Sequence, residues 1–125
     1  MVDRTRDDAV VLVIDDDFDI RLMIANILEL EGFRVQSAAN GLEAIRQLQS
    51  GLRPTLILLD LMMPVMNGWQ FMDEQARDPA LRGIPVVLVS GDERLADRAA
   101  TAGVAGYLRK PVDLDDLLRT VEQYA

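Results

Sequence analysis

Hydrophobic residues along this chain form short continuous runs, each followed by a stretch in which they recur at helical spacing. The run Ala9–Ile14 is entirely apolar and rich in β-branched residues, which predicts a strand buried on both faces. Thr55–Leu59 and Ile84–Val89 have the same buried character. Phe33–Ala38 alternates as an edge strand does, and Ala105–Leu108 forms a last short run. The pattern therefore predicts five strands.

Each predicted strand is followed by apolar residues spaced as on one face of an amphipathic helix. Asp17 and Asn40 are suited to capping the first two helices, and Asn67 suits a turn or cap before the third. Gly32 and Gly51 stand where the first two helices would end. The apolar stripes comprise Ile20, Met23, Ile24, Ile27 and Leu28; Ala44, Ile45 and Leu48; Trp69, Met72 and Ala76; Leu95, Ala99 and Ala102; and Leu114, Leu117, Leu118 and Val121.

Five strands that alternate with five helices imply parallel strand pairing, because each helix serves as a crossover connection. Right-handed crossovers leave two common doubly wound orders, and five strands fit the flavodoxin-like one best. We therefore expect an α/β fold of the (βα)5 type, a five-stranded parallel sheet in the order 2-1-3-4-5 with helices on both faces. The length of 125 residues suits a single domain.

Composition excludes several kinds of chemistry. The chain has no cysteine and no histidine, so it forms no disulfide, no Cys/His zinc site and no Ser-His-Asp triad. A formal net charge of −8 disfavours direct nucleic acid binding and contact with anionic membranes, and it favours hard cations. The apolar runs are too short to span a membrane, and residues 1–8 do not resemble a signal peptide. We expect a cytoplasmic protein.

Polar residues stand where the predicted strands end. Asp15 and Asp16 follow the first strand, Asp60 the third and Ser90 the fourth, while Lys110 follows the fifth. In such sheets ligands bind beyond the carboxyl ends of the strands, where the strand order reverses. Three carboxylates gathered there would repel one another by about 4 kcal/mol per pair at ~4 Å. A divalent cation relieves this repulsion, and oxygen ligands favour Mg²⁺, with Mn²⁺ as a substitute.

A metal beside an aspartate, a hydroxyl and an ammonium group is suited to phosphoryl transfer. Asp60 would be the nucleophile, while Lys110 and Ser90 would bind phosphoryl oxygens. No general base is needed, because a carboxylate is already ionised at neutral pH.

Four segments carry a resemblance to a known family. Ile14–Asp17, Leu59–Pro64, Val89–Gly91 and Tyr107–Pro111 resemble the signature positions of the receiver domain of two-component response regulators. The resemblance extends over nearly the whole chain. Within the family, the chain is similar to the chemotaxis-type single-domain regulators. It implies a receiver domain over residues 9–125, preceded by a flexible segment over residues 1–8.

The resemblance also implies a role for each site residue. Asp60 would accept a phosphoryl group from the phosphohistidine of a sensor histidine kinase or a histidine phosphotransfer protein. Asp16 would bind Mg²⁺ directly, Asp15 mainly through water, and Met62 through its backbone carbonyl. Ser90 stands where threonine is equally common in the family, and it would swing toward the phosphoryl group.

Further expectations concern the switch that phosphorylation would operate. Tyr107 would rotate inward behind Ser90, and Lys110 would pair with the phosphate, with a cis bond between Lys110 and Pro111. The protein would be a signalling switch rather than an enzyme, although it would take part in its own phosphorylation and dephosphorylation.

The output face, which we expect to include Arg94, Arg98 and Arg109, would bind a downstream effector or form a phosphorylation-dependent homodimer. Met62 and Asp92 occupy positions that modulate the phosphoryl lifetime in the family, so that lifetime is not predicted.

Three other functions share parts of this pattern. A receiver fold used only as a docking scaffold, without phosphorylation, stays open as an alternative. An aspartyl-phosphate phosphatase of the haloacid dehalogenase type matches at Asp15 and Asp17 but lacks the hydroxyl residue that should follow. A flavodoxin-like FMN protein would need a phosphate-binding loop after the first strand, where the acidic run Asp15–Asp19 would repel phosphate.

Overall fold

The computed structural model describes residues 9–92, 94, 97–98, 101 and 103–124. The expected flexible segment 1–8 and the expected helix positions Leu95, Ala99 and Ala102 lie outside these residues. Five parallel strands form one sheet in the order β2-β1-β3-β4-β5, which confirms the predicted topology. The strands are β1 (Val10–Ile14), β2 (Arg34–Ala38), β3 (Leu56–Leu59), β4 (Val86–Ser90) and β5 (Gly106–Arg109).

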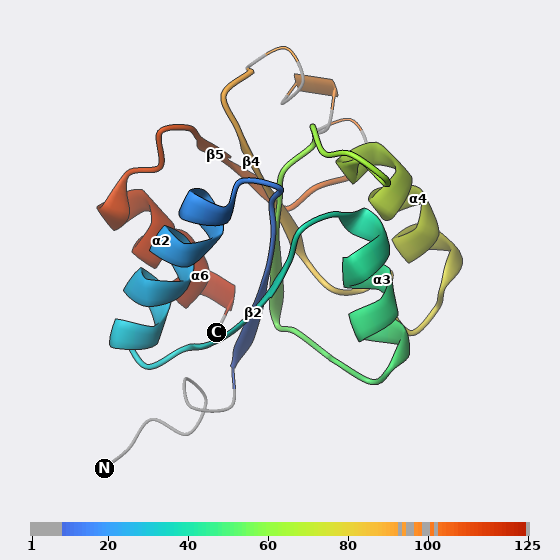
Figure 1. Cartoon of the computed structure of the whole chain (residues 1–125), viewed down its shortest axis with the longest axis horizontal. Coiled ribbons are helices and arrows are strands. Elements are labelled where there is room, and N and C mark those ends of the chain that lie inside the picture. Colours follow the sequence, from blue (N-terminus) through green and yellow to red (C-terminus); the bar gives the residue numbers. More distant parts are fainter. Residues whose placement is uncertain (1–8, 93, 95–96, 99–100, 102, 125) are drawn as a thin grey trace.

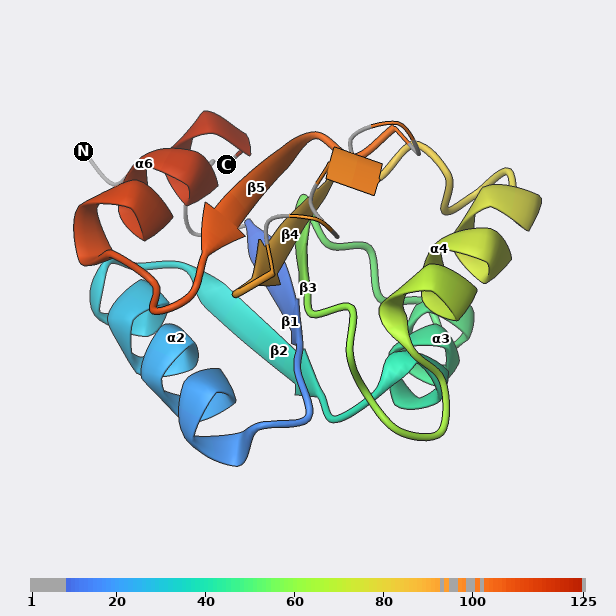
Figure 2. The same cartoon turned by 90° about the horizontal axis from the view of Figure 1, so that it is seen from above.

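Helices cover both faces of the sheet, as Figures 1 and 2 show. Helices α2 (Phe18–Leu30) and α6 (Leu114–Tyr124) pack on one face, and α3 (Gly41–Gln49) and α4 (Gly68–Arg77) pack on the other. Between β4 and β5 the described residues 94, 97–98 and 101 have helical backbone. Within the described part of the chain, no helix has the length and apolar character needed to cross a membrane.

Helix boundaries follow the expected capping residues. The Asp17 carboxylate accepts the N–H groups of residues 19 and 20, and Asn40 accepts that of residue 43. Asn67 forms a reciprocal capping box with Gln70 at the start of α4. Because Asp17 is the cap, α2 begins at Phe18, two residues before the predicted apolar stripe. Gly32 has φ +93°, the left-handed conformation that ends a helix at low cost.

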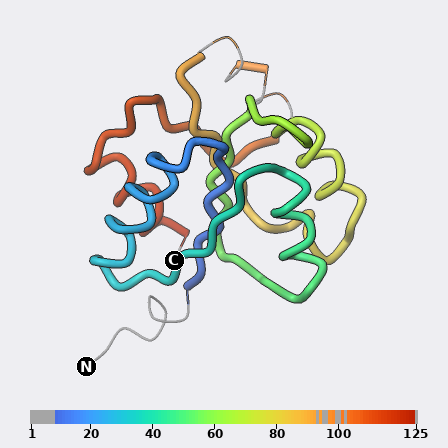
Figure 3. The backbone as a smooth tube through the Cα atoms, in the orientation of Figure 1, coloured from blue at the N-terminus to red at the C-terminus, as the bar shows by residue number. Residues whose placement is uncertain are grey.

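The central strands are buried on both faces, as continuous apolar runs predict. Every residue of β3 and β4 is buried, whereas edge strand β2 buries only Ala38. The helices and the sheet enclose two apolar clusters, one on each face of the sheet. The core thereby fixes β1, β3 and β4 side by side, and the loops after these strands gather at one edge of the molecule, at the top of Figure 3.

The packing of three helices differs from the predicted stripes. In α2, Met23 is 40% exposed, whereas Ile24 and Leu28 of the same stripe are buried. Helix α4 buries Phe71 and Gln75, while Ala76 is exposed. The polar Gln75 is tolerated because its amide nitrogen donates to the carbonyls of Leu81 and Ile84, each over 3.0 Å. In α6 the predicted core residue Leu114 is 51% exposed, and the helix buries Leu117 and Val121 instead.

Candidate functional site

Three aspartates meet at the carboxyl edge of the sheet. Asp15 and Asp16 follow β1, Asp60 follows β3, and one carboxylate oxygen from each lies within 4.8 Å of the others. Asp15 and Asp60 are buried, with 2% and 7% exposure, whereas Asp16 is exposed. The predicted convergence of these residues is therefore confirmed.

Backbone hydrogen bonds hold the two buried aspartates in place. The N–H of Asp15 donates to Ala38 O over 3.1 Å, and that of Asp60 donates to Ile14 O over 2.9 Å. Asp15 Oδ1 accepts the N–H of Asp17 over 2.9 Å. Each carboxylate is thus positioned by continuation of the strand pairing rather than by a free loop.

Lys110 reaches into the acidic cluster from beyond β5. Its Nζ lies 2.8 Å from Asp15 Oδ2 and 3.7 Å from Asp60 Oδ2. Burial disfavours the charged form of Lys110, but the bond to Asp15 and the charge of Asp60 outweigh it, so the pKa of Lys110 rises above 10.5. The bond between Lys110 and Pro111 is cis, as expected. Lys110 is therefore a charged member of the site.

The environment of Asp60 opposes its ionisation. Burial is the main cause, the nearby charge of Asp15 adds to it, and the ammonium of Lys110 partly offsets both. Together they raise the pKa of Asp60 from 3.8 to about 6. Asp60 is thus still predominantly ionised at neutral pH, as a carboxylate nucleophile must be.

The donor set fits a hard divalent cation. Asp15 Oδ2 is buried, and the group that pairs with it in the structure is the Lys110 ammonium, 2.8 Å away. Such an atom is costly to leave without a further partner. Asp16 and Asp60 add oxygen ligands nearby, and Asp16 leaves the cluster open to water, which Mg²⁺ retains in part. The Met62 side chain is an exposed thioether, a soft ligand that does not suit Mg²⁺, so only its backbone carbonyl fits this site.

Ser90 and Tyr107 are joined behind the cluster. Ser90 is buried at the end of β4, and its Oγ accepts the N–H of Asp92 over 3.1 Å. The hydroxyl of the partly buried Tyr107 donates to the carbonyl of Ser90 over 2.9 Å. The structure thus brings these two expected switch residues into direct contact with each other.

The three arginines of the expected output face have different surroundings. Arg94 pairs with Asp92 over 3.4 Å, and Arg109 is exposed at the end of β5. The Arg98 guanidinium instead lies 5.3 Å from the centre of the Trp69 ring, on α4. The sequence did not predict the contact of Arg98 with α4, and the output face itself stays a prediction.

Two positioning residues were not predicted. Arg21 Nη1 donates to the backbone carbonyl of Asp15 over 2.6 Å, a contact that its place one turn after Asp17 would have allowed us to expect. Gly68 packs against the backbone beside the phosphoacceptor candidate, where a Cβ would lie 2.7 Å from the carbonyl oxygen of Asp60. No pattern within the chain indicates that second contact.

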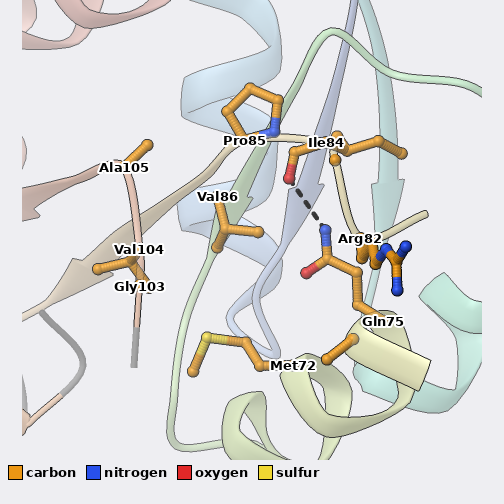
Figure 4. Close-up of a pocket in the computed structure, with 11 residues that line it drawn as sticks. Met72, Gln75, Arg82, Ile84, Pro85, Val86, Gly103, Val104 and Ala105 are labelled. Atoms are coloured by element: carbon orange, nitrogen blue, oxygen red, sulfur yellow. Dashed lines mark hydrogen bonds between the residues drawn. The ribbon is translucent and has the colours of Figure 1, made fainter. Parts of the chain in front are cut away.

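A pocket of about 270 Å³ lies far from these residues, at the amino ends of β4 and β5 (Figure 4). It is bounded by Met72 and Gln75 of α4 and by Pro85, Val86 and Val104. The acidic cluster, not this pocket, gathers the charged groups suited to phosphoryl chemistry.

Comparison with known proteins agrees with this geometry. The family model described as "Response regulator receiver domain" matches residues 11–122. Protein PilH of Pseudomonas aeruginosa is 31% identical over 113 residues, covering 89% of this chain and 93% of PilH. Several other curated relatives, among them RpaA of Synechocystis, are longer, and the chain spans 46–48% of their length.

Two solved structures extend the comparison. The chemotaxis response regulator CheY4 of Vibrio cholerae is 29% identical with a TM-score of 0.84, over 94% of this chain and 98% of that one. The receiver domain of sensor histidine kinase PA1611 from Pseudomonas aeruginosa, solved with a magnesium ion coordinated in its active site cleft, is 26% identical with a TM-score of 0.83, over 93% and 96%. Together with the matched fold and the acidic cluster, these findings show that the chain belongs to the response regulator receiver domain family, the signalling switches of two-component systems.

Proposed function

We propose that Asp60 receives a phosphoryl group, in a Mg²⁺-dependent reaction, from the phosphohistidine of a sensor histidine kinase or a histidine phosphotransfer protein. The observation that carries this proposal is the gathering of Asp15, Asp16 and Asp60 beside the ammonium of Lys110. The magnesium ion in the cleft of the PA1611 receiver domain supports it. We also propose that the protein acts in the cytoplasm.

In the transfer step, a carboxylate oxygen of Asp60 attacks phosphorus. The P–N bond of the donor imidazole breaks, its electron pair returns to the ring nitrogen, and an acyl phosphate remains on Asp60. Lys110, at 3.7 Å from Asp60, is near enough to pair with the incoming phosphoryl oxygens. Ser90, with its hydroxyl at the end of β4, would donate to another of them.

Asp15, Asp16 and Asp60, with the backbone carbonyl of Met62, would hold Mg²⁺ or Mn²⁺. When bound, the cation neutralises charge on the phosphoryl oxygens. The same residues would serve hydrolysis of the acyl phosphate, so the protein would also take part in its own dephosphorylation.

A phosphoryl group adds a charge of about −1.5 to −2 to the cluster. That charge would attract Lys110 and the Ser90 hydroxyl, and a shift of Ser90 would act on Tyr107 through their hydrogen bond. An existing equilibrium of β5 and its flanking helices would then move toward the form that binds a downstream effector or a second copy of the chain.

Intact mass spectrometry tests the proposal. The protein is incubated with acetyl phosphate in the presence of Mg²⁺, in the presence of a chelator, and as the Asp60→Asn variant. We expect a single phosphoryl adduct that requires Mg²⁺ and is absent from the variant. An adduct that persists in Asp60→Asn would contradict the assignment of Asp60.

If neither acetyl phosphate nor a phosphorylated histidine kinase produces an adduct, the proposal is wrong. A docking scaffold that works without phosphorylation would then be the better description of the chain.

A further inference from the structure

The loop that follows Asp60 is held at its far end by the first turn of α3. The backbone N–H of Gly41 donates to the carbonyl oxygen of Met66 over 2.9 Å. Gly41 is the first residue of α3, directly after its cap Asn40. An N–H at this position has no partner within its own helix, so the bond to Met66 satisfies it and fixes the loop at the same time.

Gly41 and Met66 approach so closely that no side chain fits between them. A Cβ on Gly41 would lie 2.8 Å from Met66 Cγ, 2.9 Å from its carbonyl oxygen and 3.0 Å from its Sδ. These distances are well below the ~3.5–4.0 Å of a favourable carbon contact. Gly41 does not have a positive φ, so glycine is required here by space and not by backbone conformation.

Further hydrogen bonds leave the loop little freedom to absorb a displacement. The N–H of Met66 donates to Pro64 O over 2.8 Å, so both backbone groups of Met66 are engaged. At the helix end, the N–H of Gly68 donates to Leu61 O over 3.0 Å. A displacement of the Met66 backbone therefore also displaces the short segment between Met66 and Met62, which follows Asp60.

We propose that Gly41 is a positioning residue for the metal site, because its bare backbone sets where the loop 61–66 lies. This inference rests on the proposed function, in which the Met62 carbonyl and Asp60 hold Mg²⁺. Adding a Cβ at residue 41 displaces Met66 and with it the Met62 carbonyl, whereas Asp60 stays tied to β1 by its bond to Ile14 O. The variant then binds Mg²⁺ more weakly, even though alanine is intrinsically the better helix former.

The test compares Gly41→Ala with Gly83→Ala. Gly83 also lacks a positive φ, and a Cβ there would meet no atom within 4 Å, so it is a matched control far from the cluster. Mg²⁺ is titrated while the amide NMR shifts of Asp16 and Met62 are followed. We expect the Kd for Mg²⁺ to rise about 10-fold or more in Gly41→Ala, as is typical when a ligand-orienting group is lost, and to stay unchanged in Gly83→Ala.

A second substitution separates positioning from a general loss of structure. Met66→Ala removes Cγ and Sδ, two of the three atoms that the new Cβ would strike. The double variant should therefore regain part of the lost Mg²⁺ affinity, while Met66→Ala alone should remain near wild type. In metal-free protein, the amide shift of Met62 should move in Gly41→Ala and return toward wild type in the double variant.

A folded Gly41→Ala protein that binds Mg²⁺ like wild type would overturn the inference. If Gly41→Ala does not fold, the double variant is compared with Met66→Ala, and equal Mg²⁺ affinities overturn it instead. Failure of the proposed function is a different result, namely a wild-type protein with no Mg²⁺ response and no phosphoryl adduct.

Discussion

Lys110 is paired with Asp15, with its Nζ 2.8 Å from Oδ2. The side chains of Lys110 and Asp15 are 22% and 3% exposed, so the pair is largely withdrawn from water. Removing one partner of such a pair leaves the other charge buried without compensation. The lysine that would bind phosphate therefore also stabilises the acidic cluster through its pair with Asp15.

Replacing this lysine should weaken the metal-free fold. We expect Lys110→Met to lower the free energy of unfolding near neutral pH by about 3 kcal/mol, because Asp15 loses its counter-charge. Added Mg²⁺ should restore part of the loss by supplying positive charge to the same carboxylates. Urea unfolding with chelator and with Mg²⁺ measures both effects.

Arg119→Met provides the control for this prediction. Arg119 pairs with Asp116 over 3.7 Å at the surface, where both side chains are more than half exposed. Exposed ion pairs contribute about 1 kcal/mol or less. Equal losses from the two substitutions would show that the pair between Lys110 and Asp15 has no special weight.

The raised pKa of Asp60 predicts that the difference in stability between Asp60→Asn and the wild-type protein depends on pH. The folded pKa of about 6 lies above the ordinary 3.8, so ionisation of Asp60 destabilises the fold as pH rises from about 4 to above 6. A rise of the Asp60 pKa from 3.8 to about 6 corresponds to about 3 kcal/mol. In metal-free protein near pH 7, Asp60→Asn should therefore be more stable than wild type by as much as about 3 kcal/mol, and the gain should vanish below about pH 4.

Urea unfolding across this pH range checks the prediction, with Asp73→Asn as the control. Asp73 is exposed on α4, so its replacement should leave the difference from wild type small at each pH. A gain in Asp60→Asn that is the same near pH 4 and pH 7 would argue against a raised pKa. Mg²⁺ should reduce the difference in free energy of unfolding between Asp60→Asn and wild type near pH 7, because it stabilises the ionised Asp60 of the wild-type protein.

Much of the fold and of the site could be predicted because local patterns and strand ends determine them. The continuous apolar run of β1 predicted a central strand, and Asp17 and Asn40 predicted where two helices begin. Asp15 and Asp60 follow neighbouring parallel strands, so their convergence depends only on strand order. These features depend on where the strands and helices begin and end and on the order of the strands in the sheet.

Side-chain partners across elements could not be predicted in the same way. Lys110 could reach either of two carboxylates, and it lies closer to Asp15 than to Asp60, a choice that strand order alone does not predict. Gln75 is buried because two carbonyls of the following loop need a donor, which hydrophobic spacing does not reveal. Arg98 turns toward Trp69, a residue of another helix whose position depends on how the helices pack.

Val65 in the loop after Asp60 has a strained backbone that a substitution should relieve. Its φ is +68°, and the N–H of Met66 bonds to Pro64 O over 2.8 Å, which makes a γ-turn centred on a β-branched residue. Its side chain is 73% exposed and contributes little packing. We expect Val65→Gly to raise the free energy of unfolding by up to about 1 kcal/mol, since glycine adopts positive φ without this strain but has more freedom when unfolded.

Thermal or urea unfolding of Val65→Gly and Val65→Ala distinguishes backbone strain from loss of the side chain. Alanine removes the β-branch but retains a Cβ, so it should gain less than glycine. If alanine and glycine stabilise equally, positive φ is not the source of the strain.

The contact between Arg98 and Trp69 ties the chain between β4 and β5 to α4. Because an exposed cation–π pair contributes about 0.5–1 kcal/mol, Arg98→Ala should lower the free energy of unfolding by about that amount. Trp69 is the only tryptophan, so its fluorescence should change in Arg98→Ala but not in Arg94→Ala, whose arginine pairs with Asp92 instead. A double-mutant cycle with Trp69→Leu isolates the pair, and a coupling near zero would mean that Arg98 does not bind the ring in solution.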